Sequence, residues 1–359
     1  MLWNGGIGGA EVFTVSLAEH ANRLGAVVTL VFLEEPGHLR ARLEDKSLAY
    51  VSLGLARGRD LLGHPVRFRR AVAEHGPDGA LLVDCGLMGA SLKAAGYRAP
   101  IVAVEHGARM AAFGRKPLRR GLWWLARLAG ACADDVEVGV SEFMVRCMRR
   151  GFHARDVRLI HNGVQVPAQQ PQPAAQPQTA TGGLIVGFAA RLVPGKGADH
   201  LLRALALLSG EDVRLRIAGE GPQRGELEAL AQELGVAERV CFAGLVLDMP
   251  AFWRGCSVAV ACSAEFIEAC PMAPLEAMAA GRPVLASDNG GLSELLAAGV
   301  GSLLQPGDPG AIADALRRYL EDERLRASHG RAARRHVRAR FEIERCAASY
   351  LALFDELGG

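Results

Sequence analysis

Residues 268–287 read "EACPMAPLEAMAAGRPVLAS", and this stretch decides the fold and the site that we expect for the chain. Glu268 follows the apolar run "SVAVACS" at 257–263, and Glu276, with seven residues between, falls inside a helix that begins near Pro271. Proline is tolerated in the first helical turn because its missing N–H would have no helical partner there. A helix start offers amides and a partial positive charge to an anion, while carboxylates accept hydrogen bonds from hydroxyls. The stretch therefore predicts a site for a diphosphate between two polyhydroxy groups, which is the outline of a nucleotide sugar.

Strand and helix patterns alternate along the whole chain. The apolar run "LIVGFAAR" (184–191) precedes the helical pattern "GADHLLRALALLS" (197–209), and the helical pattern at 11–25 precedes the run "AVVTLVFL" (26–33). Nearly continuous apolar strands between helices indicate parallel sheets covered on both faces. We therefore expect an α/β fold made of two Rossmann-like doubly wound domains facing across a cleft. The other expected strands lie in the runs 79–86, 100–107, 135–141, 213–219, 239–245, 257–263 and 282–288.

One segment divides the chain into these two domains. Residues 165–182, "QVPAQQPQPAAQPQTATG", are rich in proline and glutamine and nearly without large apolar side chains. Such a segment cannot pack a core, so we expect an extended linker. The N-terminal domain is then expected over 1–164 and the C-terminal domain over 183–338. Because parallel sheets bind ligands at the carboxyl ends of their strands, the loops at those ends should carry the chemistry.

Composition excludes several classes of protein. At 359 residues and 50% apolar content, the chain is long enough for two domains. The net charge of +2 comes from scattered charges of both signs and gives no basic field for nucleic acid. No apolar stretch reaches membrane-spanning length without a charge or a turn signal. The cysteines lie singly in apolar runs, which is typical of reduced thiols in a cytoplasmic protein; they are Cys85, Cys132, Cys147, Cys241, Cys256, Cys262, Cys270 and Cys346.

Several motifs occur in an order that resembles the family-four retaining glycosyltransferases of the GT-B fold. The Glu, seven residues, Glu signature of that family matches 268–287, and "GGAE" at 8–11 resembles its first-domain glycine loop. "HNGV" at 161–164 resembles the entry to the linker. "ARLVPGKG" at 190–197 resembles the phosphate-binding turn, and "IAGEGP" at 217–222 resembles the following strand end. The resemblance covers essentially the whole chain.

The resemblance implies a role for each charged residue at these motifs. Arg191 and Lys196 would hold the diphosphate of the donor. Glu276 would bind the ribose hydroxyls, and Glu268 a hydroxyl of the donor sugar. His106, at the end of the run "PIVAVEHG", matches the family's first-domain histidine beside the reacting centre. We therefore take Glu268 and His106 as the catalytic candidates.

The resemblance also implies contacts made by the backbone. The chain near Leu245, after "VCFAG", would meet the base of the nucleotide. The final helical stretch, 339–359, would cross back onto the N-terminal domain, as it does in the family. The remaining donor-binding candidates lie at two helix starts and are Gly8, Gly9, Pro271, Met272 and Ala273.

The expected chemistry needs no metal and no cofactor. Two cations and several aligned amides can stabilise the charge of a departing diphosphate by themselves. No Asp-x-Asp pair lies beside a strand of the sugar site, since the acids at 134–135 precede a strand. The family implies retention of configuration and a nucleotide sugar, most simply a UDP-sugar, as donor. The acceptor would be a hydroxyl of a cell-envelope glycan or lipid precursor, or of a secondary metabolite.

Two other functions stay open at the level of the sequence. The glycine cluster with Glu34 past the second strand resembles a nicotinamide-dinucleotide fold, in which an acid binds the ribose. After Gly6 and Gly8, however, the third glycine position of that fingerprint falls on Glu11. An oxidoreductase would also leave the motifs of the second domain without a function. The second alternative is a catalytically inactive protein that binds sugar nucleotides.

Two further segments suggest properties beyond the site. The run "RKPLRRGLWWLARLAG" at 115–130 suits either a helix on an anionic membrane surface or an ordinary amphipathic helix that packs its tryptophans inward. The residues "MLW" at 1–3 can supply only the end of the strand that normally precedes a glycine loop. We therefore expect the first strand to be truncated here and the natural translation start to lie upstream.

Overall fold

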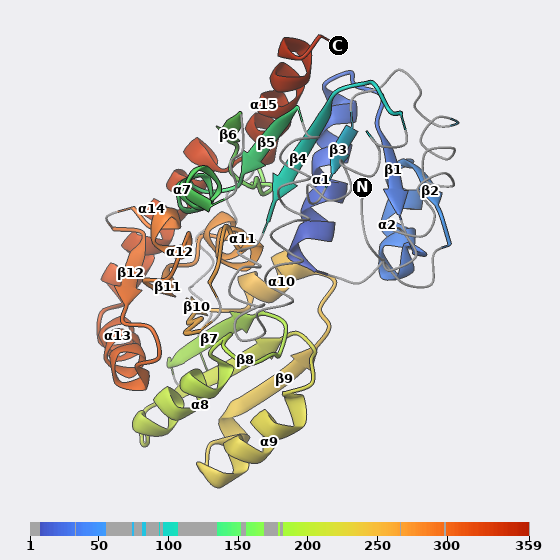
Figure 1. The fold of residues 1–359 in the computed structure, drawn as a ribbon. Coiled ribbons are helices and arrows are strands. Elements are labelled where there is room, and N and C mark those ends of the chain that lie inside the picture. The colour runs from blue at the N-terminus through green and yellow to red at the C-terminus, as the bar shows by residue number, and fades with distance from the viewer. Residues whose placement is uncertain are drawn as a thin grey trace. The chain divides into compact units, whose positions relative to one another are not determined.

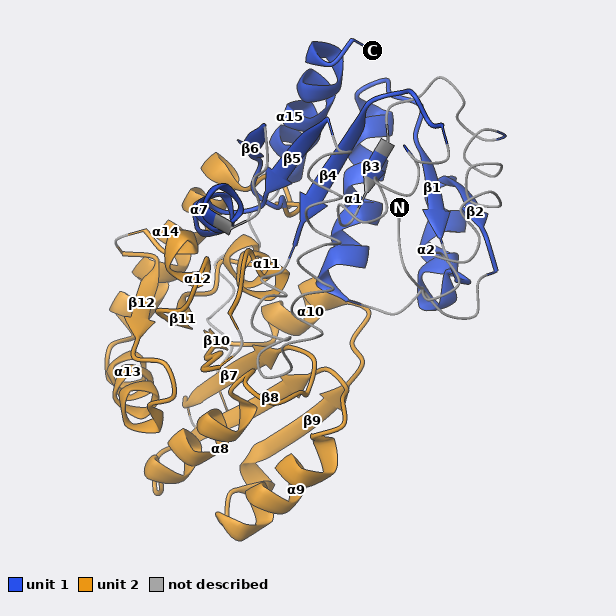
Figure 2. Cartoon of the chain, viewed as in Figure 1, with its two compact units in different colours: residues 1–163, 343–359 blue, residues 164–342 orange. Residues whose placement is uncertain are grey.

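The computed structural model divides the chain into two compact units, which Figure 2 shows in different colours. Unit 1 comprises Met1–Gly163 together with Ile343–Gly359, and unit 2 comprises Val164–Glu342. The residues that the structure describes are 8–32, 34–54, 74, 81–83, 93, 96–106, 135–151, 156–168, 179, 182–265, 267–297 and 299–358.

Unit 1 contains two parallel sheets in its described part (Figure 1). One sheet pairs β1 with β2, and the other has the strand order β3-β4-β5-β6. The strands are short, and β4 and β5 are buried along their length because helices cover parallel sheets. The elements are α1 (Gly9–Arg23), β1 (Thr29–Phe32), η1 (Gly37–Leu39), α2 (Arg40–Asp45), β2 (Ala49–Ser52), β3 (Leu81–Val83), β4 (Ile101–Glu105), β5 (Val136–Gly139), α7 (Glu142–Gly151), β6 (Val157–Leu159) and α15 (Ile343–Glu356).

The last helix of the chain, α15, packs against the first, α1, inside unit 1. His20 on α1 is 2% exposed, and its Nε2 lies 3.1 Å from Oε1 of Glu344 on α15. Near the other end of α15, Arg158 donates from Nη2 to Oε1 of Glu356 at 2.7 Å. Polar contacts at both ends of α15 therefore attach the C-terminal helix to elements that lie far earlier in the sequence.

Unit 2 is built on a single six-stranded parallel sheet with the order β12-β11-β10-β7-β8-β9. β7 lies in the middle and pairs with β8 on one side and β10 on the other. The elements are β7 (Leu184–Ala189), α8 (Ala198–Leu207), β8 (Val213–Ala218), α9 (Arg224–Glu233), η3 (Ala237–Arg239), β9 (Val240–Gly244), α10 (Met249–Arg254), β10 (Val258–Ala261), α11 (Met272–Ala279), β11 (Val284–Ser287), α12 (Leu292–Leu295), β12 (Gly301–Leu304), α13 (Pro309–Glu321) and α14 (Glu323–Arg340).

Alternate residues of β7 face opposite sides of this sheet, and helices cover both. Val186 and Phe188 are buried in the core cluster that α8, α9 and α13 cover. Gly187 faces the other side, where the ring of Trp253 on α10 packs against it. The strand at the centre of unit 2 is therefore enclosed on both faces, as a nearly continuous apolar run predicts.

The predicted fold class is confirmed by this architecture: both units are α/β, and every described strand pair within a named sheet is parallel. Three strands, β2, β6 and β12, were not expected from the sequence. Their residues are "AYVS", "VRL" and "GSLL", which are too short or too polar to stand out as strand patterns. They form because a neighbouring parallel strand offers hydrogen bonds at the edge of each sheet.

Three sequence predictions fall outside the described residues. These are the truncated first strand at 1–3, the amphipathic run at 115–130 and most of the linker at 165–182. Among the described helices, none combines the length and the apolar character needed to cross a membrane.

Candidate functional site

The candidate site of unit 2 is centred on an ion pair between two of the predicted residues. Lys196 lies in the loop between β7 and α8, and Glu268 in the loop between β10 and α11. The Lys196 Nζ lies 2.5 Å from Glu268 Oε1, and the two side chains are 13% and 12% exposed. The Oγ of Ser263 donates to the same carboxylate oxygen at 2.8 Å. The structure therefore brings a cation and a carboxylate together at the carboxyl edge of the sheet.

A close contact between the backbones of the two loops fixes this arrangement. Gly197 has φ +87°, and a Cβ there would lie 2.0 Å from the carbonyl oxygen of Cys262. The Cys262 Sγ donates to the Gly197 carbonyl at 3.1 Å, and the Ala264 amide donates to the Gly195 carbonyl at 3.0 Å. Only glycine can adopt this left-handed conformation and also approach the Cys262 carbonyl so closely, which explains the glycine at position 197.

Cys262 acts here as a buried hydrogen-bond donor. Burial raises the pKa of its thiol to about 12, because a thiolate would lose its hydration. The thiol therefore stays protonated at neutral pH and keeps its donor for the Gly197 carbonyl. A nucleophilic role would require the thiolate, so the environment of Cys262 favours packing over reactivity.

The backbone of Glu268 is held by the loop after β11. The Gly291 amide donates to the Glu268 carbonyl at 2.7 Å, and a Cβ on Gly290, which has φ +63°, would lie 2.4 Å from that oxygen. The Asn289 Nδ2 donates to the carbonyls of Ser263 and Ala264 at 3.1 and 3.2 Å. The loop after β11 thus fixes the loop that carries the Glu268 carboxylate, both through the Asn289 side chain and through the Gly291 backbone.

Helix α11 begins directly after this loop and carries the second predicted glutamate. Pro271 is its N-cap residue and no side chain caps the helix, nor does its first turn contain an acidic residue. A helix start of this kind offers its amides and its partial positive charge to an anion. Glu276 follows one turn later, is half-buried, and accepts from the indole Nε1 of Trp253 at 3.5 Å. Met272 and Ala273, the other candidates at this helix start, are its first two residues.

Two further candidates of unit 2 present exposed side chains. Arg191 comes two residues after β7, and its carbonyl accepts from the Val193 amide at 3.0 Å. Leu245 directly follows β9 and is 41% exposed. Both lie at the carboxyl edge of the same sheet as Lys196. Their roles toward a ligand stay predictions, as do those of the other site residues.

The candidates of unit 1 lie on α1 or against it. Gly8 is the N-cap residue of α1 and Gly9 its first residue, while His106 directly follows β4. The His106 ring packs edge-on against Phe13 of α1, with 5.4 Å between ring centroids. A Cβ on Gly8 would lie 2.3 Å from a carboxylate oxygen of Glu11. This helix start therefore carries an acid of its own, unlike the start of α11.

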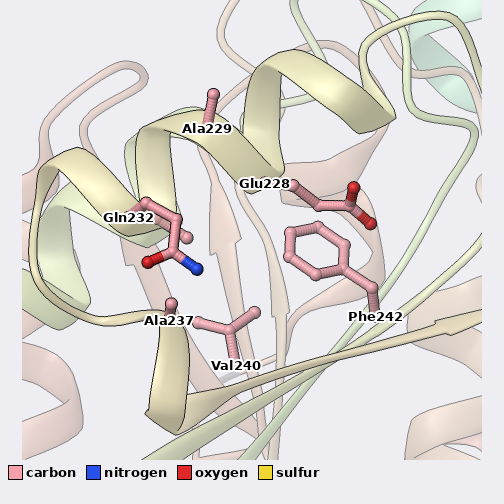
Figure 3. A pocket seen from close by; sticks show the side chains of 7 residues that line it. Glu228, Ala229, Gln232, Ala237, Val240 and Phe242 are labelled. Atoms are coloured by element: carbon pink, nitrogen blue, oxygen red, sulfur yellow. The ribbon is translucent and has the colours of Figure 1, made fainter.

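A cavity of about 370 Å³ lies elsewhere in unit 2 (Figure 3). It opens between α9 and β9 and includes Val240, the first residue of β9, so it begins at the amino edge of the sheet. None of the predicted site residues lines it. Its lining residues are Glu228, Ala229, Ala231, Gln232, Ala237, Val240 and Phe242. Within the described residues, no group of three or more His, Cys, Asp or Glu is arranged to hold a metal ion.

Sequence reasoning missed three side chains that contact the predicted site: Ser263, Asn289 and Trp253. Ser263 and Asn289 each follow a buried strand by two residues, so their places at strand ends could have indicated them. Trp253 gave no such signal, because it lies within a short amphipathic helix. Its contact with Glu276 depends on how α10 and α11 pack.

Two family models match the chain and together cover most of it. "Glycosyltransferase Family 4" matches residues 7–166, and "Glycosyl transferases group 1" matches residues 170–336. The chain belongs to the family-four glycosyltransferases. The stretch that includes Lys196, Glu268 and Glu276 falls in the second match, and the stretch that includes His106 falls in the first.

Curated relatives match this chain over only part of their own length. The lipopolysaccharide core biosynthesis mannosyltransferase LpcC of Rhizobium leguminosarum bv. viciae is 33% identical over 213 residues, which are 56% of this chain and 60% of the relative. The 2-deoxystreptamine glucosyltransferase of Streptomyces kanamyceticus is 32% identical over 183 residues, which are 50% of this chain and 47% of the relative. The chain thus spans about half the length of the curated relatives it matches.

Solved structures share the fold of this chain over nearly all of its residues. The Anabaena HepE protein, crystallised with UDP and glucose, has a TM-score of 0.81 at 20% identity and covers 99% of both chains. Sucrose-phosphate synthase from Thermosynechococcus elongatus has a TM-score of 0.83 at 22% identity and covers 99% of this chain and 95% of its own. These likenesses show the GT-B fold. Neither the dinucleotide-dependent oxidoreductase nor the inactive binding protein receives support from the comparisons.

Proposed function

We propose that this glycosyltransferase moves a sugar from a nucleotide-diphosphate sugar to a hydroxyl of an acceptor, with retention of configuration. The observation that carries the proposal is the shielded Lys196–Glu268 pair directly before the uncapped start of α11. The ammonium and the helix amides attract the diphosphate, and the carboxylates accept hydrogen bonds from sugar hydroxyls. Glu276 lies on the same helix, in a position to bind the ribose.

The proposed step breaks the bond from the anomeric carbon to the diphosphate oxygen and forms a bond to the acceptor oxygen on the same face. The acceptor proton passes to the departing phosphate. Negative charge grows on the leaving group while the sugar carbon gains oxocarbenium character, so cations aligned before the reaction lower the barrier. Arg191 and Lys196 supply that charge, and His106 of unit 1 remains the second catalytic candidate.

The structural neighbours support a class of donor, and the curated relatives support a class of acceptor. One structural neighbour, Anabaena HepE, was crystallised with UDP, with UDP and glucose, and with UDP-glucose, so we propose a UDP-sugar as donor. The relatives named above act on a lipopolysaccharide core and on 2-deoxystreptamine. A cell-envelope precursor or a secondary metabolite with a free hydroxyl is therefore the acceptor class that we propose.

We place this reaction in the cytoplasm. Eight cysteines scattered singly through apolar runs suit a reducing compartment. The arginine-rich run at 115–130, which lies outside the described residues, is the segment by which the protein would reach an anionic membrane surface.

A donor screen followed by product analysis tests the proposal. We expect UDP-sugars to raise the melting temperature of the protein, because a ligand that binds only the folded state stabilises it. The donor found in this way is then incubated with candidate acceptors, product mass is measured by mass spectrometry, and the anomeric configuration by proton NMR. A melting temperature unmoved by every nucleotide sugar, or a product of inverted configuration, would contradict the proposal.

A separate prediction concerns metal. Because Arg191, Lys196 and the amides of α11 can neutralise a diphosphate, we expect the transfer rate in EDTA to equal the rate in untreated protein. The measurement compares initial rates in EDTA with rates after Mg²⁺ or Mn²⁺ is added in excess. Loss of activity in EDTA, with recovery when either ion is added, would show that a metal ion neutralises the diphosphate and would contradict the prediction.

A further inference from the structure

Trp253 is a large buried side chain with one polar atom, and that atom lies beside a predicted ligand-binding carboxylate. The side chain belongs to α10 and is 1% exposed. Its indole N–H donates to Glu276 Oε2 at 3.5 Å. A buried indole N–H needs an acceptor, because leaving it without one costs free energy. The half-buried Glu276 supplies that acceptor.

The ring of Trp253 is held in place by three groups of the same unit. A Cβ on Gly187 of β7 would lie 2.8 Å from a ring carbon of Trp253, so the indole occupies the space that this glycine leaves. Phe252 packs edge-on against the ring at 4.9 Å between centroids. The guanidinium of Arg216 in turn covers the Phe252 ring at 5.0 Å. The indole ring is therefore held between its own helix, α10, and the central strand β7.

We propose that Trp253 is a positioning residue that holds the Glu276 carboxylate in the orientation that binds the ribose of the donor. The inference rests on the proposed function, because it assumes that Glu276 contacts the ribose. A glutamate on a helix surface samples several rotamers, and a hydrogen bond from a rigid donor selects one of them. Trp253 thus acts on nucleotide affinity through Glu276 and touches neither donor nor acceptor.

The test replaces Trp253 by phenylalanine, which keeps an aromatic ring and removes the N–H. Affinities for UDP and for 2′,3′-dideoxy-UDP are measured by calorimetry. We expect Trp253→Phe to weaken UDP binding about 5- to 10-fold, which is less than a hydrogen bond to a charged group usually contributes, because the contact is long. The dideoxy nucleotide has no ribose hydroxyls for Glu276 to bind, so we expect its affinity to change less than about 2-fold, within the range of small packing effects.

Two controls separate positioning from packing. Phe252→Leu disturbs the same helix but leaves the indole N–H in place, so we expect equal effects on the two nucleotides. In a Glu276→Ala background, which has no side-chain acceptor, Trp253→Phe should add little further loss, because two residues that act through one interaction are not additive. In transfer assays, the donor KM should rise in Trp253→Phe while kcat stays near that of the wild type.

The outcomes distinguish this inference from the proposed function. If Trp253→Phe weakens both nucleotides equally, or neither, the positioning role is wrong even though the protein binds UDP. If the wild-type protein binds neither UDP nor any UDP-sugar, the proposed function itself fails, and the positioning role fails with it.

Discussion

Lys196→Ala is expected to weaken donor binding by about 10- to 150-fold, the range for losing one charge-assisted hydrogen bond. The reason is that the variant removes the cation nearest to Glu268 and the start of α11, where we place the diphosphate. Glu276→Ala should weaken donor binding by a similar factor through the ribose. Titration calorimetry with the donor measures both changes directly.

Glu268→Ala should behave differently from these two variants. A carboxylate on a hydroxyl of the transferred sugar orients the reacting carbon, so its loss should lower kcat more than donor affinity. Steady-state kinetics with the natural acceptor or with water as acceptor separates the two parameters. If Lys196→Ala, Glu276→Ala and Glu268→Ala all kept wild-type affinity and rate, the site assignment would be wrong.

Arg317→Ala provides a matched control for the charge removed in Lys196→Ala. Arg317 on α13 pairs with Glu211 at 2.9 Å, so it also belongs to an ion pair of unit 2. Its side chain is 37% exposed, whereas that of Lys196 is 13% exposed, and no site residue contacts it among the described pairs. We expect donor affinity to stay unchanged in Arg317→Ala, which would show that the effect at Lys196 is local.

Gly197→Ala is expected to cause a large loss of stability. The added Cβ would lie 2.0 Å from the Cys262 carbonyl oxygen, and the residue would hold a φ of +87°. The Cβ would clash with a backbone oxygen at the end of the central strand β10. To avoid the clash, either β10 or the loop before α8 must move. We expect a loss of more than about 4 kcal/mol, which is a large part of the roughly 5–15 kcal/mol that stabilises a typical domain. Urea unfolding followed by circular dichroism measures the loss.

Gly210→Ala isolates the conformational part of this loss. Gly210 has φ +86°, nearly the same as Gly197, but a Cβ there would meet no atom within 4 Å. The variant should therefore lose only about 1–2 kcal/mol, the cost of a left-handed conformation for a residue with a Cβ. If Gly197→Ala and Gly210→Ala lost the same amount of stability, the contact with Cys262 would contribute nothing to the loss at Gly197.

The elements of both units could be predicted from local pattern. The runs at 184–191 and 213–219 became β7 and β8 because apolar residues in short runs between helices are buried inside a parallel sheet. Three edge strands escaped prediction, since an edge strand has weaker burial and needs a neighbour to pair with. The start of α11 at Met272 was also predictable, because the prolines at 271 and 274 suit a first helical turn.

The sequence by itself determined which residues we propose for the site, whereas only the tertiary structure decided which of them meet. Lys196 and Glu268 are 72 residues apart, and no periodicity links them. They meet because β10 crosses over to pair with β7, so that the loops after these two strands lie at the same edge of the sheet. The contact of Trp253 with Glu276 likewise depends on the packing of α10 beside α11. Local sequence fixes the period of each element, but strand order and helix packing depend on long-range burial, which a short window of residues does not contain.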